Sequence, residues 1–383
     1  MKAKLFFLAA GMFTMGCDDY IVAGLLPGIA GSMHTTLAGA TQGLPAFGFT
    51  YVFCAPLFAI LLARQPARRV MAAALLIFAA GNVLTLLSGS FAAYIASRAI
   101  AGIGAGMFLP VAVASAAQLV EPEARGRAMG LIWSANSAGA VVGVPCGLGL
   151  SAMFGWKVTI GLILLLALVT LAGILARLPD LAAPTPPSRR EQLQLLLDPR
   201  VLSVVGISCL TATGSLGLYA LAASFQAGSV NSLEASLSLW TVGGLIGSTL
   251  IGHVVDRWRH PRAVMAAILG VLALALAALP ALGNVPVLGL VPFLIWGAMG
   301  WATVTPQQLA LVEVQPDQKA TVVALNSSGY GLGSICGSAL GGLALASGAD
   351  ARTLPYAAAG LVLAALLWQL TLLRQPTPVQ EAA

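Results

Sequence analysis

Long apolar runs recur along this chain and constrain its fold more than any other feature. Runs of about 20 residues, the length of a helix that crosses roughly 30 Å of hydrocarbon, follow one another from Phe6 to Leu373. Short basic or Gly/Pro-rich turns separate them. Only 8% of the residues are charged and 58% are hydrophobic, against roughly 25% charged in soluble domains. The chain is therefore predicted to be an all-α membrane protein.

Twelve such runs predict two sets of six transmembrane helices. The first set covers residues 5–27, 41–62, 70–87, 92–119, 128–153 and 158–178. The second set covers residues 201–225, 233–255, 263–282, 285–312, 320–346 and 354–373. The first run is interpreted as a retained helix rather than a secretory signal, because it is long and contains Asp18 and Asp19.

The basic residues predict the orientation of the chain in the membrane. Lys and Arg in short loops stay on the cytoplasmic side. With the N-terminus inside, all of the 19 Lys and Arg residues except Arg98, Lys157 and Arg352 fall on the inner side. This asymmetry predicts cytoplasmic termini in a bacterial-type inner (cell) membrane. Contact with anionic lipid headgroups accounts for the net charge of +6, so nucleic acid is not an expected partner.

The cysteines and histidines do not form a metal-binding pattern. The cysteines are Cys17, Cys54, Cys146, Cys209 and Cys336, all inside predicted helices, where they are expected to act as small buried hydrophobic residues. The histidines are His34, His253 and His260, near helix ends and far from a cysteine cluster. We predict no metal and no cofactor. An intramembrane enzyme is not expected either, because neither an H-E-x-x-H pair nor a pair of facing Asp residues is present.

A hydrophilic connector near the middle of the chain predicts two domains. Pro179 to Arg200 holds a proline cluster followed by Arg189, Arg190 and Glu191, and is the only long polar stretch between apolar runs. The predicted organisation is an N-terminal half over residues 1–178, a cytoplasmic linker over 179–200, a C-terminal half over 201–374 and a short cytoplasmic tail over 375–383. Many transporters duplicate a six-helix half in this way.

Internal sequence similarity supports the same division. Arg68 and the segment 70–73 reappear 194 residues later as Arg262 and the segment 264–267. Six residues of the fifth helix recur 190 residues later in the eleventh: Asn136, Ser137, Gly139, Gly143, Cys146 and Gly147 match Asn326, Ser327, Gly329, Gly333, Cys336 and Gly337. Two matches in corresponding places of the two halves predict a repeated unit.

The first helix carries a motif that resembles a known family. Gly16, Cys17, Asp18, Asp19 and Tyr20, followed by Gly24 to Pro27, are similar to the G-T-x-E-F…G-L-L-P pattern of arabinose-efflux-like members of the major facilitator superfamily. Asp19 occupies the acidic position of that pattern and Tyr20 the aromatic position. The resemblance covers essentially the whole chain and extends to the twelve-helix drug:proton antiporter group, which includes sugar- and chloramphenicol-efflux relatives.

Three further motifs carry the same resemblance. The G-x-x-x-D-R loop signature is present in the second half as Gly252, Asp256 and Arg257, whereas Ala59 and Ala63 replace its Gly and Asp in the first half. The R-x-x-x-G-x-G motif, linked in the family to proton coupling, matches Arg98, Gly102, Gly104 and Gly106. The exporter pattern of helix 5 matches Gly139, Gly143, Pro145 and Gly147, with Val144 inserted where Gly and Pro more often adjoin.

Charge at membrane depth points independently to the same residues. An ionisable side chain in the hydrocarbon costs at least about 2.5–3.5 kcal/mol, so one that is present usually lines a cavity, pairs with another charge or carries a proton. Asp18, Asp19 and Arg98 are the clear cases. Asp19 lies roughly 20 Å from the inner start of helix 1 and Arg98 roughly 9 Å from the outer start of helix 4, which are similar depths. Asp19 is predicted to carry the proton, with Asp18 as support or a second site.

Each of these assignments has a structural alternative. One Asp could form a permanent ion pair with Arg98 that only holds helices 1 and 4 together. The glycines of helices 4, 5 and 11 could serve close helix packing rather than a gating role for Gly143 to Gly147. Adjacent residues point about 100° apart on a helix, so Asp18 and Asp19 are not expected to face one cavity.

Polar and aromatic side chains on helices 1, 4, 7 and 10, with two from helices 5 and 11, are the candidates for a substrate cavity. They are Tyr20, Asn136, Tyr219, Trp301, Gln307, Gln308 and Asn326. For any one of them, an interhelical hydrogen bond or an interfacial aromatic contact is favoured over a ligand contact. Pro110 and Pro306 are expected to break their helices and free backbone carbonyls. The few charges in this set favour a neutral or cationic solute.

The resemblance implies a secondary transporter that exports a small organic solute, a drug-like compound or a sugar, in exchange for protons by alternating access. A proton symporter or a facilitative carrier that imports a metabolite would share the fold and differ in coupling. A channel or a scaffold would not predict two similar halves with a buried Asp and Arg. One polypeptide supplies both halves, so a functional monomer is expected, with its small-molecule substrate, protons and lipids as partners.

Overall fold

The described part of the chain is helical throughout. The computed structural model describes residues 2–33, 35, 40, 42–179, 194–195, 197–226, 229–283 and 285–373 of the 383 residues. Twelve helical spans in these residues are long and apolar enough to cross a membrane: Lys4–Val22, Gly43–Leu61, Ala67–Leu87, Phe91–Gln118, Pro122–Phe154, Trp156–Arg177, Pro199–Ala220, Leu233–Trp258, Pro261–Leu282, Leu288–Val314, Lys319–Ala346 and Ala351–Leu373. Each overlaps one predicted run, so the predicted fold class and helix number are confirmed.

Contacts divide the chain into two compact units, Met1–Arg189 and Arg190–Ala383. The division falls within the predicted linker 179–200, most of which lies outside the described residues, as does the predicted tail 375–383. We call the two parts unit 1 and unit 2.

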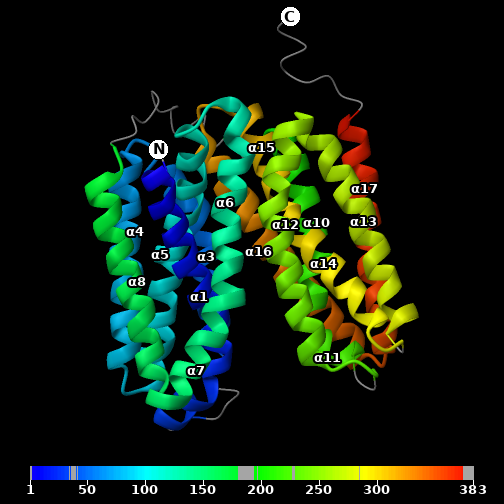
Figure 1. The fold of residues 1–383 in the computed structure, drawn as a ribbon, viewed down its shortest axis with the longest axis horizontal. Coiled ribbons are helices and arrows are strands. Elements are labelled where there is room, and N and C mark those ends of the chain that lie inside the picture. Colours follow the sequence, from blue (N-terminus) through cyan, green and yellow to red (C-terminus); the bar gives the residue numbers. More distant parts are fainter. Residues whose placement is uncertain are drawn as a thin grey trace, which may run out of the picture. The chain divides into compact units, whose positions relative to one another are not determined.

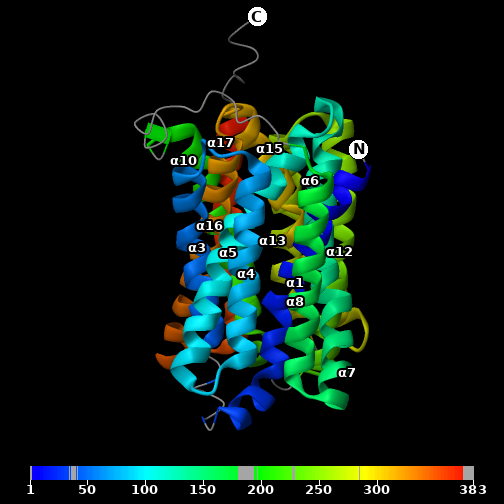
Figure 2. The same cartoon turned by 90° about the vertical axis from the view of Figure 1, so that its left-hand side faces the viewer.

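Unit 1 is a bundle in which each helix contacts a defined set of neighbours (Figure 1). Its elements are α1 (Lys2–Ser32), α3 (Gly43–Leu61), α4 (Ala67–Leu87), α5 (Phe91–Gln118), η1 (Pro122–Ala124), α6 (Arg125–Ala138), η2 (Gly139–Gly143), α7 (Val144–Phe154) and α8 (Trp156–Arg177). Helices α3 and α4 pack against α5, whereas α1 packs against α6, η2 and α8. Figure 2 shows α3, α4 and α5 side by side along much of their length.

Unit 2 repeats this arrangement with its own helices. Its elements are α10 (Pro199–Ala220), α11 (Ala222–Phe225), α12 (Leu233–Trp258), α13 (Pro261–Leu282), η3 (Leu288–Leu290), α14 (Val291–Ala302), α15 (Val304–Val314), α16 (Lys319–Ala346), η4 (Ala351–Thr353) and α17 (Leu354–Leu373). Helix α10 packs on α16 as α1 packs on α6 and η2, and α12 packs on α14 as α3 packs on α5. The internal repeat seen in the sequence is therefore a repeat of helix pairing.

Two spans contain a local irregularity. The fifth span is α-helical up to Ala138, changes to a π-helical turn over Gly139–Gly143, and continues as α7 with Pro145 in its first turn. The tenth span is interrupted at Thr303, between α14 and α15. A π turn inside an α-helix often occurs at a functional site.

The prediction of breaks at the two prolines is wrong in part. Helix α5 runs without interruption from Phe91 to Gln118 and contains Pro110. Helices α3 and α4 both pack against this continuous helix. The break in the tenth span lies at Thr303 rather than at Pro306, which sits in the first turn of α15, where a missing backbone N–H is tolerated.

Candidate functional site

Close packing of α1 on the fifth span positions the two carboxylates of the first helix. A Cβ atom added to Gly139 would lie 2.5 Å from the carbonyl oxygen of Phe13 and 2.7 Å from the backbone nitrogen of Cys17. A Cβ on Gly16 would meet the carbonyl oxygen of Asn136. Small residues on both helices therefore let the backbones touch immediately before Asp18.

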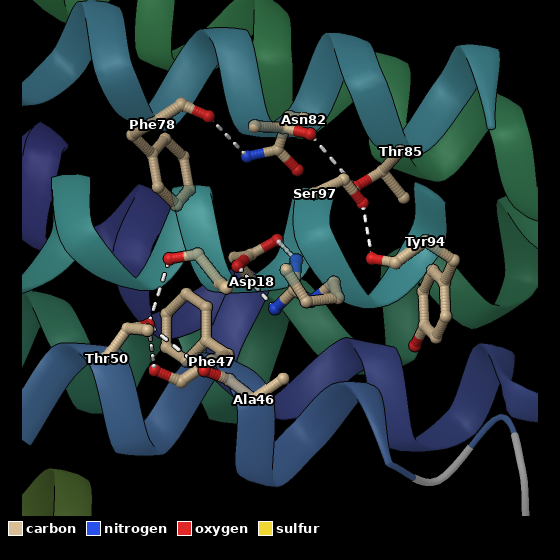
Figure 3. A network of polar contacts seen from close by, with 12 residues as sticks. Asp18, Ala46, Phe47, Thr50, Phe78, Asn82, Thr85, Tyr94 and Ser97 are labelled. Carbon is tan, nitrogen blue, oxygen red and sulfur yellow. Dashed lines mark hydrogen bonds and ion pairs between the residues drawn. The ribbon is translucent and has the colours of Figure 1, made fainter. Parts of the chain in front are cut away.

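Asp18 forms a two-point ion pair with Arg98 of α5 (Figure 3). Nη2 of Arg98 donates to Oδ2 at 2.9 Å and Nη1 donates to Oδ1 at 3.1 Å. The side chains are 0% and 1% exposed, respectively. Parallel charge-assisted hydrogen bonds of this kind are strong and orientation-specific. The pair joins helices α1 and α5 inside unit 1 and is the only salt bridge recorded among the described residues.

Helix α3 covers the guanidinium group from another side. The centre of the Phe47 ring lies 4.7 Å from Cζ of Arg98, within range of a cation–π interaction. Thr50 donates across the helix boundary to the carbonyl oxygen of Ala99, at 2.9 Å. A Cβ on Gly102 would meet the carbonyl oxygen of Phe47, so the predicted glycine motif of helix 4 brings α3 close to Arg98.

Helix α4 contributes a row of neutral polar side chains next to the ion pair (Figure 3). Thr85 and Ser97 share a hydrogen bond of 2.8 Å between their hydroxyl groups, and Asn82 donates to the carbonyl oxygen of Phe78 at 3.1 Å. Three buried polar atoms here have no hydrogen-bond partner among the described residues: Oδ1 of Asn82, Oη of Tyr94 and Nε of Arg98. The ion pair thus sits in a polar but incompletely hydrogen-bonded part of unit 1.

Asp19, the predicted proton site, lies apart from the ion pair. Its side chain is exposed, and no hydrogen bond or ion pair joins it to another described residue. It interacts electrostatically with both Asp18 and Arg98. The expectation that the two carboxylates face different directions agrees with this arrangement. The carboxylate bound to Arg98 is that of Asp18, so the pairing that the sequence left open is decided in favour of Asp18.

Unit 2 contains the same helix contact without the charges. A Cβ on Gly143 would meet the sulfur of Cys17, and a Cβ on the repeat-related Gly333 would meet the carbonyl oxygen of Cys209. Cys17 and Cys209 therefore occupy matching places. The residues that follow Cys209 are Leu210 and Thr211, where unit 1 has Asp18 and Asp19. The carboxylates are a feature of one half of the repeat only.

Aromatic side chains fill the corresponding region of unit 2. The rings of Tyr219 and Trp240 stack with centroids 4.2 Å apart, and Trp240 makes edge contacts with Trp296 at 6.0 Å and with Trp301 at 6.3 Å. Tyr219 is half-buried, whereas the three tryptophans are buried. Nε1 of Trp296 donates to Oγ of Ser215 at 2.8 Å and so ties α14 to α10. We call these four rings the aromatic cluster.

Removing the hydroxyl group of Ser215 is expected to destabilise unit 2. Ser215→Ala leaves the buried indole N–H of Trp296 without an acceptor, which should lower the free energy of unfolding by about 1–3 kcal/mol. Denaturation of the purified protein followed by tryptophan fluorescence measures this. Ser338→Ala is the matched control: Ser338 is half-buried on α16 and donates to the carbonyl oxygen of Ile335 in its own helix, so this variant should unfold like the wild type. Equal stability of the two variants would contradict the role assigned to this bond.

The remaining predicted cavity residues lie on several helices of the two units. Asn136 donates to the carbonyl oxygen of Met12 at 3.3 Å, so it forms an interhelical hydrogen bond, and Tyr20 is half-buried. Gln307 and Gln308 are buried on α15. Asn326 is 0% exposed and neither of its amide atoms has a hydrogen-bond partner among the described residues. The structure confirms no substrate contact for these residues, and they stay predictions.

The predicted loop signature of the second half lies at the end of α12. Gly252 is buried, Asp256 is half-buried and Arg257 is exposed in the last turns of this helix. Arg259 ends the helix in the left-handed region, with φ 55°. Arg262 donates to the carbonyl oxygen of Leu372 at 3.3 Å, which ties the start of α13 to the end of α17. The signature therefore marks a helix junction of unit 2.

Several important residues were missed by sequence reasoning. Phe47, Trp240 and Ser215 carry no signal in a single sequence, because aromatic and small residues occur throughout membrane helices. Tyr94 precedes Arg98 by four residues and so lies on the same helix face, which was a usable signal. No group of three or more His, Cys, Asp or Glu residues in the described segments is arranged to hold a metal ion.

Comparisons with known proteins agree on one family and fold. The sequence model of the Major Facilitator Superfamily matches residues 8–317. The Bacillus subtilis protein named "Uncharacterized MFS-type transporter YbcL" is 28% identical over 345 residues, covering 89% of this chain and 88% of that protein. The "Chloramphenicol resistance protein" of Streptomyces lividans is 29% identical over 310 residues, covering 79% of each. The solved outward-conformation structure of the transporter FucP superposes with a TM-score of 0.80 at 15% identity, covering 97% of this chain and 99% of that chain.

Proposed function

We infer, because this chain belongs to the Major Facilitator Superfamily, that it is a proton-coupled secondary transporter that exports a small organic solute from the cytoplasm. Membership of this family and the twelve-span fold support a membrane transporter, and the proposal includes that the protein is not an enzyme. The proposal adds the direction of transport, the coupling to protons, the inner membrane and the cytoplasmic location of both termini. It also keeps a monomer as the working unit and excludes nucleic acid as a partner.

The arrangement of Asp18, Asp19 and Arg98 is the observation that carries the proposal. A charge that faces hydrocarbon is costly, so an exposed carboxylate at membrane depth is stable only beside water or when it is protonated. Asp19 is exposed and unpaired, and can therefore exchange a proton, whereas Asp18 is held by Arg98. The ion pair fixes the position of α1 on α5 and so holds the turn of α1 that carries Asp19.

Export and a neutral or cationic solute are supported by separate features. The Gly139 to Gly147 segment packs directly on the part of α1 that precedes and follows the carboxylates, so a change at Asp19 can reach the fifth span by direct contact. One relative is named as a chloramphenicol resistance protein, in keeping with export of a drug-like compound. The aromatic cluster of unit 2 offers a half-buried ring, Tyr219, rather than a cation that would recognise an anion.

Replacing Asp19 by Asn is expected to abolish substrate-induced proton release. The experiment uses proteoliposomes and a panel of neutral sugars, nucleosides, phenicols and lipophilic cations, with pH recorded as each compound is added. Asn keeps the shape of the side chain but cannot exchange a proton. Asp317→Asn, an exposed residue between α15 and α16, is the control and should couple like the wild type.

Each result of this experiment has a defined meaning. Coupled proton release in the wild type and the control, lost in the Asp19 variant, supports both the antiporter proposal and its proton site. Retained coupling in the variant would show that Asp19 is not the proton carrier and would move that role to Asp18. Uptake of a compound together with protons would contradict export.

A proton symporter or facilitative carrier is the alternative. The fold neighbour FucP is described in a second solved structure as the Escherichia coli fucose:proton symporter, which shows that a fold of this kind also serves import in that protein. Imposed gradients separate the alternatives. An antiporter accumulates solute in inverted vesicles that are acid inside, a symporter is driven out of them, and a facilitative carrier does not respond.

A further inference from the structure

The ion pair of Asp18 and Arg98 raises a physical problem if it opens during transport. Arg98 is 1% exposed, and its two Nη groups bind only the Asp18 carboxylate. A guanidinium group does not lose its proton in a protein, so protonation of Asp18 would leave a buried cation without its counter-ion. Such a state is accessible only if the surroundings of Arg98 supply other partners.

Unit 1 holds two unused hydrogen-bond acceptors on the helices that border this cation. Oη of Tyr94 and Oδ1 of Asn82 have no hydrogen-bond partner among the described residues, and both side chains are 0% exposed. Nε of Arg98 is likewise unpartnered. Buried polar atoms are nearly always paired, so an unpaired donor beside unpaired acceptors requires an explanation.

Tyr94 lies one turn before Arg98 on α5. Residues four apart on an α-helix lie on one face, so the two side chains extend from the same face of this helix. The two side chains interact electrostatically, as Arg98 also does with Asp18 and Asp19.

Asn82 lies on the adjoining part of α4. The Thr85–Ser97 hydrogen bond and the contact of Gly81 with the backbone of Ala101 place this turn of α4 against residues 97–101 of α5. Figure 3 shows Asn82 and Tyr94 on the two helices that border the ion pair. Both are neutral, so they can accept a hydrogen bond from a cation without adding a charge to the bundle.

We propose that Tyr94 and Asn82 are positioning residues that receive the guanidinium group of Arg98 when it leaves Asp18. Arg98 then has two resting positions: the ion pair seen here, and a neutral one in which Oη of Tyr94 and Oδ1 of Asn82 accept its N–H groups. The ring of Phe47 covers the guanidinium face in the first position. The inference rests on the proposed function and adds one step to it: the pair opens when Asp18, the second candidate proton site, takes up a proton.

A double-mutant cycle on the purified protein tests this without a transport assay. The variants are Asp18→Asn, which removes the counter-ion, Tyr94→Phe, and both together, with thermal unfolding as the readout. Tyr94→Phe alone should change little, because its hydroxyl group is unpartnered in the ion-paired state. In the Asp18→Asn background, Tyr94→Phe should lower the folding equilibrium constant about tenfold, because one hydrogen bond to a cation is lost. Additive effects would overturn the proposal.

A second background keeps the test decisive. If Asp18→Asn does not fold, the cycle is repeated with Asp18→Ala, and additive effects of Asp18→Ala and Tyr94→Phe would overturn the proposal in the same way. Tyr356→Phe on the exposed face of α17 is the control.

Transport assays separate this inference from the proposed function. In proteoliposomes, Tyr94→Phe should lower the rate of coupled transport by about tenfold, because the open state of the ion pair loses one hydrogen bond to a cation. Non-additive effects of the two substitutions on stability, in a protein that moves no protons, would sustain the inference and refute the proposed function. Proton-coupled transport with additive effects of the two substitutions on stability would refute the inference and leave the proposed function standing.

Discussion

Replacement of Arg98 by methionine is expected to destabilise the protein strongly and to abolish proton-coupled transport. The change leaves the Asp18 carboxylate, which is 0% exposed, without its only ion-pair partner. Removing one member of a buried pair typically costs about 3–5 kcal/mol. Denaturation in detergent gives the stability, and substrate-induced proton release in proteoliposomes gives the activity.

A double variant distinguishes coupling from simple packing. Asp18→Leu combined with Arg98→Met replaces the pair by apolar side chains, and such replacements are often neutral or stabilising. Most of the lost stability should return, whereas transport should not. Return of transport in this variant would show that the pair only holds α1 and α5 together, which is the alternative left open by the sequence.

Replacement of Gly139 by leucine is the second change with a large expected effect. Its first side-chain atom would lie 2.5 Å from the carbonyl oxygen of Phe13 and 2.7 Å from the nitrogen of Cys17. Both are backbone atoms, so the clash is relieved only if α1 moves away from η2. We expect a loss of about 3 kcal/mol or more, the upper end of overpacking effects, and loss of transport because Asp18 and Asp19 move with α1.

Gly149→Leu is the matched control for this prediction. Gly149 lies on α7, less than three turns from Gly139, and an added Cβ there meets no atom within 4 Å. The control should keep wild-type stability and transport, measured in the same denaturation and proteoliposome assays. Equal behaviour of the two leucine variants would show that the close approach at Gly139 does not position the carboxylates.

The two units use one helix arrangement for different chemistry. The repeated contact places Cys17 and Cys209 at matching glycines, yet charged residues follow Cys17 and uncharged residues follow Cys209. Unit 2 has its aromatic cluster on the helices that correspond to α1, α3 and α5. This division is in keeping with a proton step in unit 1 and recognition of an uncharged ring in unit 2.

The number of helices, their repeat and the unusual position of Asp18, Asp19 and Arg98 within apolar helices were predictable from the sequence alone. The length of an apolar run is a property of the linear chain, because a helix has a fixed rise per residue and the bilayer a fixed thickness. Charges at membrane depth are conspicuous for the same reason: their cost depends on where they lie along a helix. The similarity of segments 190 residues apart is equally visible without a structure.

The tertiary structure alone decided which residues meet. Asp18 and Asp19 differ by one position, and only the packing of α1 on α5 determined that Asp18 binds Arg98 while Asp19 stays exposed. The same holds for Phe47 over Arg98, and for the continuous helix at Pro110 against the break at Thr303. The helical period determines which residues of one helix share a face. Which face packs against a neighbouring helix depends on the side chains of both helices. A single sequence therefore reveals which residues are costly to bury, and the packed helices determine what each is buried against.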